Sequence, residues 1–204
     1  MKAAKPQETK DTARTFIAIP MPFLVKQQVS LFTVSLQAHL KRHFPEALPH
    51  IRWIKQENLH VTLRFLGSIT PEQINFIKEH AEPVIRNTRP FKTVFTTLVA
   101  FPSFDEPQII ALAPHPQPPI IALAYKMEDI AKECGLAAEK QPYQPHLTIA
   151  RIDRKTRVNW KNINAPKVRL AVEDIFLFQS KLGDEASVYE QLAAFPLATS
   201  ASLG

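Results

Sequence analysis

Two short segments of this sequence carry the residue types that acid–base chemistry needs. Residues 60–63 read His-Val-Thr-Leu, and residues 146–149 read His-Leu-Thr-Ile. A single His-x-Thr on a strand is usually a half-buried histidine with a satisfied hydrogen bond. Two copies that are both followed by an apolar residue are far less expected by chance, so the pair indicates a function.

Strand geometry separates the side chains of each motif onto two faces. Successive side chains of a β-strand point to opposite sides. His60 and Thr62 therefore point one way and their apolar neighbours the other, and the same holds for His146 and Thr148. Each strand can bury its apolar pair and present an imidazole and a hydroxyl on the opposite face. If two lobes of the protein face each other, the four polar groups converge in one cleft.

Such a cleft suits the hydrolysis of a phosphodiester without a metal ion. Imidazole titrates near pH 6.5, so a neutral ring can take a proton from water while a protonated ring gives one to a departing alkoxide. Threonine hydroxyls can donate hydrogen bonds to phosphate oxygens. In-line displacement needs the base and the acid on opposite sides of phosphorus, and two facing strands supply both. The residues alone do not say which histidine takes which role. A metal site is less favoured, because no carboxylates accompany the two histidines in register.

The elements around the motifs predict an α+β fold. We expect helices from Pro22 to about His43, from Thr70 into the 80s, and from about residue 119 to a C-terminal cap at Gly135. We expect strands over residues 14–19, 51–54, 59–66 (ended by Gly67), 91–101, 108–113 and 146–151, then a hairpin of residues 166–180 and 187–196. With one motif strand in each half, this order predicts two pseudo-symmetric lobes of antiparallel sheet flanked by helices, with a central cleft. Residues 14–197 would form a single bilobal domain, between a disordered N-terminal arm (1–13) and a disordered tail (198–204).

Composition narrows the class of protein. The chain has 204 residues, 45% of them apolar, which is ordinary for a globular domain. The formal charge of +6 and the pI near 9.5 favour an anionic partner such as nucleic acid. One cysteine, Cys134, excludes an internal disulfide and a cysteine-rich metal site. No apolar run is long enough for a membrane span and the N-terminus lacks a signal sequence, so we expect a cytoplasmic protein without membrane contact.

Longer segments around the motifs resemble a known family. The chain resembles the 2H phosphoesterase superfamily, and within it the RNA 2′,3′-cyclic phosphodiesterases, also called 2′-5′ RNA ligases. The resemblance runs over roughly residues 14–197. It rests on five segments in order: RTFIAIP, IRWIKQENLHVTLRFLG, VAFPSFDEPQIIALA, YQPHLTIAR and LFQSKLGDEASVYEQLAAFPL.

The resemblance implies an activity and a role for each histidine. Such enzymes open an RNA 2′,3′-cyclic phosphate to a 2′-phosphate, and in reverse they join RNA ends by a 2′-5′ linkage. By the family pattern His60 is the proton donor and His146 the proton acceptor, with Thr62 and Thr148 beside them. The implied partner is RNA with a 2′,3′-cyclic phosphate end, such as a tRNA fragment. No cofactor, metal or obligatory protein partner is expected.

Two arginines are candidates for the phosphate. The family has an arginine that contacts phosphate five residues after the second motif histidine, and here that residue is Arg151. Strict alternation places Arg151 on the face opposite His146, so it contributes only if the strand ends or bulges at Ala150. Alternation places Arg64 on the face of His60, which makes it a second candidate; the alternative is a solvated arginine at a strand end.

Three aromatic residues near the motifs are candidates for base stacking. Single-stranded RNA ends are commonly held by bases that stack on aromatic rings beside a basic groove. Phe101, Phe104 and Tyr143 lie in loops or at strand ends near the motifs, and the alternative for each is ordinary core packing. Two other functions stay open: a related phosphodiesterase that acts on 2′-5′ oligonucleotides or another small cyclic phosphate, and a module that binds RNA ends without turnover.

Overall fold

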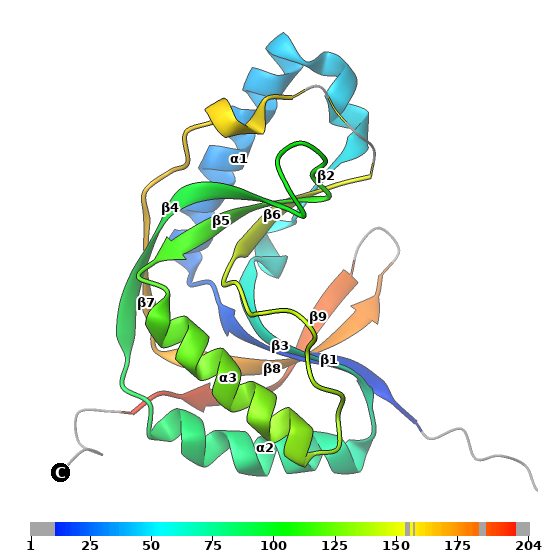
Figure 1. Ribbon diagram of the computed structural model, residues 1–204, viewed down its shortest axis with the longest axis vertical. Coiled ribbons are helices and arrows are strands. Elements are labelled where there is room, and N and C mark those ends of the chain that lie inside the picture. The colour runs from blue at the N-terminus through cyan, green and yellow to red at the C-terminus, as the bar shows by residue number, and fades with distance from the viewer. Residues whose placement is uncertain (1–10, 154–155, 157, 184–186, 199–204) are drawn as a thin grey trace, which may run out of the picture.

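Two antiparallel sheets make up the framework of the computed structural model, which describes residues 11–153, 156, 158–183 and 187–198 (Figure 1). The four-stranded sheet has the order β3-β1-β8-β9, with β1 Ala13–Pro20, β3 His60–Ile69, β8 Asp174–Leu182 and β9 Ser187–Pro196. The five-stranded sheet has the order β2-β6-β5-β4-β7, with β2 Ile51–Trp53, β6 Leu147–Ile152, β5 Ile109–His115, β4 Phe91–Phe101 and β7 Val168–Val172. The predicted α+β fold of two antiparallel sheets with flanking helices is confirmed.

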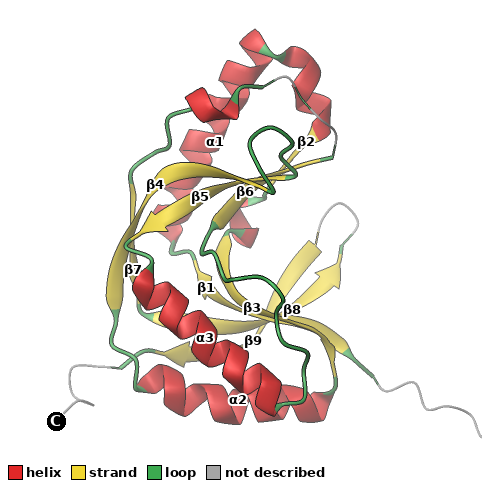
Figure 2. Cartoon of the chain, viewed as in Figure 1, coloured by secondary structure: helices red, strands yellow, loops and turns green. Residues whose placement is uncertain are grey.

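The helices link the two sheets because each of two helices crosses between them (Figure 2). Helix α1 (Phe23–His43) follows β1 of the four-stranded sheet but contacts β7 of the five-stranded one. Helix α3 (Pro118–Glu133) follows β5 and packs instead against β3, beside α2 (Pro71–Arg86). Helix α2, by contrast, follows β3 and contacts β9 of the same four-stranded sheet.

Local signals account for the helix ends. The hydroxyl of Thr70 accepts a hydrogen bond from the amide of Gln73, and the Gln73 side chain accepts one from the Thr70 amide, which completes a capping box. Gly135 follows α3 with a φ of +79°, a left-handed conformation that favours glycine. Both ends were predicted, and α2 continues through Pro83 to Arg86.

Two strand predictions need correction. The segment 166–180 is not one strand: β7 and β8 belong to different sheets, and the chain crosses between them at Glu173. The buried residues are Val168, Leu170 and Val172, then Ile175 and Leu177, so two successive polar residues change the parity of the pattern at the crossing. Gly67 does not end β3 either, because the strand continues to Ile69 past a register shift at this glycine, whose φ is +75°.

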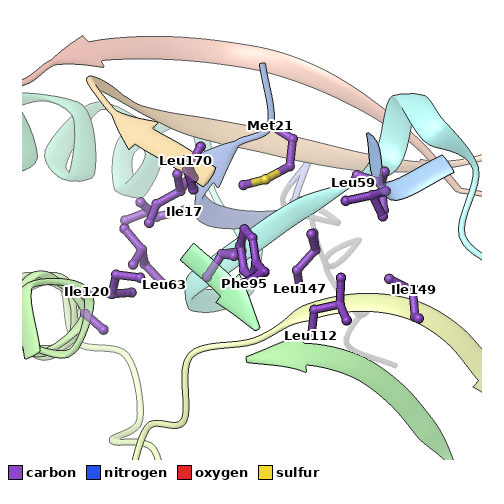
Figure 3. Close-up of a cluster of buried hydrophobic side chains, with 14 of the residues drawn as sticks. Ile17, Met21, Leu59, Leu63, Phe95, Leu112, Ile120, Leu147, Ile149 and Leu170 are labelled. Atoms are coloured by element: carbon purple, nitrogen blue, oxygen red, sulfur yellow. The ribbon is translucent and has the colours of Figure 1, made fainter. Parts of the chain in front are cut away.

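The apolar faces of both motif strands pack into one core between the sheets (Figure 3). Leu63 enters this core from β3, and Leu147 and Ile149 enter it from β6; each is at most 3% exposed. The two lobes therefore share their hydrophobic interior, and their relative position is fixed by packing rather than by a linker.

The proposed N-terminal arm and C-terminal tail lie almost entirely outside the described residues, which begin at residue 11 and end at residue 198. Along the described part of the chain, no helix combines the length and the apolar character needed to cross a membrane.

Candidate active site

The second motif strand contains a β-bulge directly after its threonine. Ala111 of β5 lies opposite Thr148, whereas the preceding residue, Ile110, lies opposite Ala150, so Ile149 is an extra residue in β6. Ile149 and Ala150 are both fully buried, although they are neighbours in a strand. Because the bulge shifts the alternation by one residue, Arg151 shares the exposed face with Thr148 rather than pointing away from it. The bulge that Arg151 needs in order to share the face of the motif residues is therefore present.

The first motif strand contains the same irregularity at the same place. Ala18 of β1 lies opposite Thr62 and Ile17 opposite Arg64, so Leu63 is the extra residue of β3. Leu63 and Arg64 are both buried, at 3% and 6% exposure, and the next residue, Phe65, is 55% exposed. The placement of Arg64 on the face of His60 was therefore wrong. Phe65 takes that place, and it is the counterpart in β3 of Arg151 in β6.

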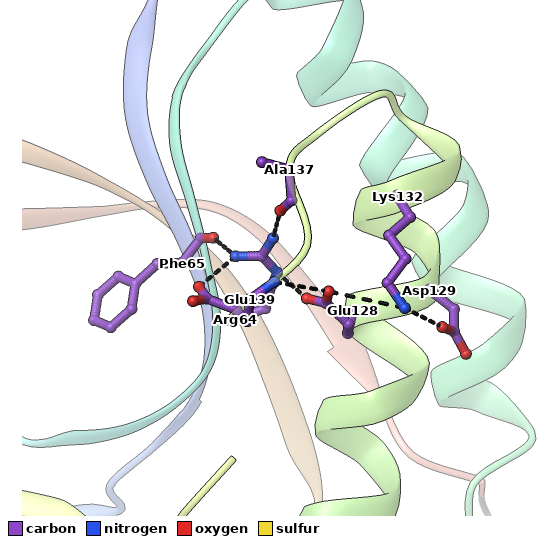
Figure 4. A network of polar contacts seen from close by, with 7 residues as sticks. All are labelled: Arg64, Phe65, Glu128, Asp129, Lys132, Ala137 and Glu139. Carbon is purple, nitrogen blue, oxygen red and sulfur yellow. Dashed lines mark hydrogen bonds and ion pairs between the residues drawn. The ribbon is translucent and has the colours of Figure 1, made fainter. Parts of the chain in front are cut away.

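Arg64 is held by protein groups on the interior side of β3 (Figure 4). Its guanidinium lies 2.5 Å from a carboxylate oxygen of Glu128 and 2.6 Å from one of Glu139. It also donates to the carbonyl oxygens of Ala137 (2.5 Å) and Phe65. These contacts connect β3 to α3 and to the loop that follows α3, so Arg64 joins structural elements and is not a solvated strand-end arginine.

Each motif histidine is oriented by the carbonyl group two residues before it. Nδ1 of His60 lies 2.7 Å from the oxygen of Asn58, and Nδ1 of His146 lies 2.9 Å from the oxygen of Gln144. A carbonyl oxygen only accepts hydrogen bonds, so Nδ1 carries the proton in both rings and Nε2 is the nitrogen available for chemistry. Nε2 of His60 lies 3.0 Å from the hydroxyl oxygen of Thr62.

Positive charges from the second motif region act on the His60 ring. Burial first, and then the positive charges of His146, Arg151 and Lys26, lower the pKa of His60 to about 4, although its hydrogen bond to Asn58 acts in the opposite direction. Burial and Arg151 also lower the pKa of His146. Arg151 thus acts on both imidazoles, and both rings are neutral at pH 7 when no anion is bound. A bound phosphodiester brings a negative charge that favours protonation of either ring.

Aromatic rings surround both imidazoles. The centroid of the His60 ring lies 4.9 Å from that of Phe16 and 5.2 Å from that of Tyr189. The His146 ring lies 4.8 Å from that of Phe101. These rings contribute to the burial that lowers both pKa values.

Two cavities that share no residue adjoin the histidines. One, of about 570 Å³, has His60 in its wall, and we call it the His60 cavity. The other, of about 580 Å³, has Thr62 and His146 in its wall, and we call it the His146 cavity. Both are within the size range of small-molecule sites.

Of the three aromatic residues predicted to stack on bases, two line a cavity beside a motif histidine and one does not. Phe101 and Tyr143 line the His146 cavity together with Phe65. The hydroxyl of Tyr143 donates to the backbone oxygen of Thr62 at 2.7 Å and so connects the segment before the second motif to the first motif. Phe104 packs half-buried against the core and lines neither cavity.

Several residues at the site were not predicted. Phe65 was missed because only the bulge places it on the cleft face. Phe176, Phe178 and Tyr189 line the His60 cavity, and the alternation of large aromatic residues in β8 was a usable signal for the first two. Among the described residues, no group of three or more His, Cys, Asp or Glu is close enough to hold a metal ion.

Comparison with known proteins identifies the family. The sequence model of the 2′-5′ RNA ligase superfamily matches residues 35–184. The chain belongs to the 2′-5′ RNA ligase superfamily. This assignment agrees with the resemblance carried by the two motifs, and it places the bulged strands and paired histidines in a superfamily domain that includes most of the chain.

Individual members of the superfamily and solved structures agree with the assignment. An RNA 2′,3′-cyclic phosphodiesterase of Thermotoga maritima is 28% identical over 88% of this chain and 92% of its own length. One of Geobacillus stearothermophilus is 25% identical over 89% of this chain, which spans only 56% of that protein. The crystal structure of E. coli LigT complexed with 3′-AMP has a TM-score of 0.74 at 21% identity and covers 93% of this chain and all of its own. A Thermus thermophilus structure, TT0787, has a TM-score of 0.73 at 21% identity and covers 92% of this chain and 99% of its own. These structures share the fold.

Proposed function

We propose that the protein hydrolyses RNA 2′,3′-cyclic phosphate ends to 2′-phosphate ends by two-histidine acid–base catalysis, and that the same site can join RNA ends by a 2′-5′ linkage. One observation carries the proposal: Thr62 of the first motif and His146 of the second line the same cavity, and each motif imidazole is held through Nδ1 so that its Nε2 is available. The relatives named as RNA 2′,3′-cyclic phosphodiesterases support the choice of substrate.

The proposed reaction moves one proton at each histidine. Nε2 of His146 takes a proton from a water molecule, and the water oxygen forms a bond to phosphorus. The bond from phosphorus to O3′ breaks, and Nε2 of His60 gives its proton to that oxygen, while the phosphate stays on O2′. His146 ends protonated and His60 neutral, and proton exchange with water restores the starting state. In ligation a 5′-hydroxyl replaces the water.

Other residues hold the substrate. The hydroxyls of Thr62 and Thr148 share a face with their histidines and donate hydrogen bonds to the non-bridging phosphate oxygens. Arg151 neutralises the phosphate, and its guanidinium can form two parallel hydrogen bonds with it. In the His146 cavity, Phe65, Phe101 and Tyr143 offer apolar surface to the base of the terminal nucleotide.

The test is hydrolysis of an oligoribonucleotide with a 2′,3′-cyclic phosphate end, in EDTA, with the position of the product phosphate identified. His60→Ala and His146→Ala are each expected to lower the rate by about 10²–10⁴. His80→Ala is the control, because His80 lies on α2 and bonds the carbonyl of Phe76. A 3′-phosphate product, loss of all turnover in EDTA, or tight RNA binding without any product would each overturn the proposal.

A further inference from the structure

The His60 cavity has no role in the chemistry above, yet it adjoins the proposed proton donor. Three aromatic residues contribute to its wall: Phe176 and Phe178 of β8, and Tyr189 of β9. Lys26 also lines it, and the Lys26 ammonium donates to the backbone oxygen of Glu57 at 3.2 Å.

Strand register places Phe176 at a defined distance from the catalytic threonine. Ala18 of β1 lies opposite Thr62 of β3 on one side and opposite Phe176 of β8 on the other. The three residues form one row across the sheet, with a small residue in the middle. Phe176 is therefore two strands from Thr62, or roughly 10 Å at the usual spacing between strands.

The chemistry of a cyclic-phosphate end decides what can reach this cavity. The phosphate joins O2′ and O3′ of the terminal ribose. The base is attached to C1′, next to C2′, whereas the RNA chain continues from C4′, next to C3′. When the 2′,3′ edge of the sugar faces the histidines, the base and the chain therefore leave in opposite directions. O3′ lies at His60 in the proposed reaction, so the chain leaves on the side of the His60 cavity.

We infer that the His60 cavity binds the nucleoside that precedes the cyclic-phosphate nucleotide, with its base on Phe176. This inference rests on the proposed function and deepens it, because it makes an oligonucleotide end, rather than a mononucleotide, the preferred substrate. Lys26 faces the phosphate that connects the two nucleotides. The wall also includes Glu57, Glu173 and Asp174, and this mixed charge suits an uncharged base better than a further phosphate.

The experiment compares three substrates: adenosine 2′,3′-cyclic phosphate, the same compound with a 5′-phosphate, and a dinucleotide that ends in it. The 5′-phosphorylated compound controls for the added charge. In the unaltered protein, kcat/KM for the dinucleotide should exceed that for the 5′-phosphorylated compound by about tenfold or more, as expected for one base–aromatic stack.

Substitutions at Phe176 assign this preference to the cavity. Phe176→Ala should bring the ratio of the two kcat/KM values close to one, and Phe176→Tyr, which keeps a ring, should preserve it. Phe23→Ala is the matched control, because it removes a phenyl ring that is 67% exposed and lines neither cavity. A ratio near one in the unaltered protein, or an unchanged ratio in a folded Phe176→Ala or Phe176→Leu variant, overturns the inference. Failure of all three substrates to give a 2′-phosphate overturns the proposed function instead.

Discussion

Replacing Arg64 should lower the folding stability of the protein much more than it weakens substrate binding, because the side chain contributes to the wall of the His146 cavity but is almost fully buried. The side chain is only 6% exposed and lies between the carboxylates of Glu128, 12% exposed, and Glu139, 53% exposed. Arg64→Met keeps the length of the side chain but leaves the Glu128 carboxylate with only the more distant, half-exposed ammonium of Lys132, 3.9 Å away, as a cation. Removal of one partner of a buried ion pair costs about 3–5 kcal/mol of folding stability.

The size of this loss makes it measurable. For a chain of this length 1 kcal/mol corresponds to roughly 2–4 °C in Tm, so the expected decrease is about 6–20 °C. Glu139→Gln should cost no more than about 1 kcal/mol, because that carboxylate is half in water. The double variant Arg64→Met, Glu128→Gln should recover part of the loss, since it removes the charge that Arg64 no longer neutralises.

The assay combines urea unfolding with kinetics at a temperature where every variant is folded. We expect a lower urea midpoint for Arg64→Met and a kcat/KM within about threefold of the unaltered protein, because surface contacts of the substrate are retained. An unchanged midpoint together with a large increase in KM would refute the reasoning. That result would return Arg64 to the phosphate-binding role that simple strand alternation predicted.

Three further predictions concern the site. The kcat/KM of hydrolysis should be highest between about pH 4 and 6.5, because burial lowers the pKa of His60 to about 4 and also lowers that of His146. A higher pH deprotonates the proton donor, and a lower pH protonates the proton acceptor. A measured optimum above pH 7.5 would contradict this prediction. Arg151→Gln should move the pH–rate profile to higher pH, since the arginine lowers the pKa values of both histidines. It should also lower kcat/KM by about tenfold or more, because charge-assisted hydrogen bonds to the phosphate are lost. An unchanged pH–rate profile would show that Arg151 does not act on the two imidazoles. Tyr143→Phe removes the hydrogen bond to the Thr62 carbonyl. It should lower the folding stability, measured by urea unfolding, by about 0.5–1.5 kcal/mol and should also lower kcat. A variant with unchanged stability and kcat would show that this hydrogen bond does not position the first motif.

Much of the fold was predictable from local patterns. The helix that starts at Thr70 is specified by a capping box and a proline at the first helical position, and the end of α3 by Gly135. These signals depend on residues within one turn of the chain. The crossing at Glu173 was also predictable, since two successive polar residues change the parity of the buried pattern there. The sequence does not indicate, however, that β7 and β8 join different sheets, because strand-forming residues continue on both sides of the crossing.

The placement of the arginines was not predictable from the motif strands alone. Alternation gave Arg64 to the cleft and Arg151 to the opposite face, and a bulge after each threonine reversed both. A bulge is a property of a pair of strands, because it exists only relative to the register of the neighbour. Neither HVTLRF nor HLTIAR contains a glycine that would signal it.

The sequence by itself determined the types and order of the elements and the chemistry of the two motifs. Histidine supplies a proton-transfer group, and the apolar residues beside it require a buried strand face. The tertiary structure alone decided that Thr62 and His146 line one cavity, that a bulge after each threonine brings Phe65 and Arg151 to the exposed face of its strand, and that a second cavity adjoins His60. These features arise from contacts between segments far apart in the chain, which no local pattern encodes, because the shared core of the two sheets sets their distance and register.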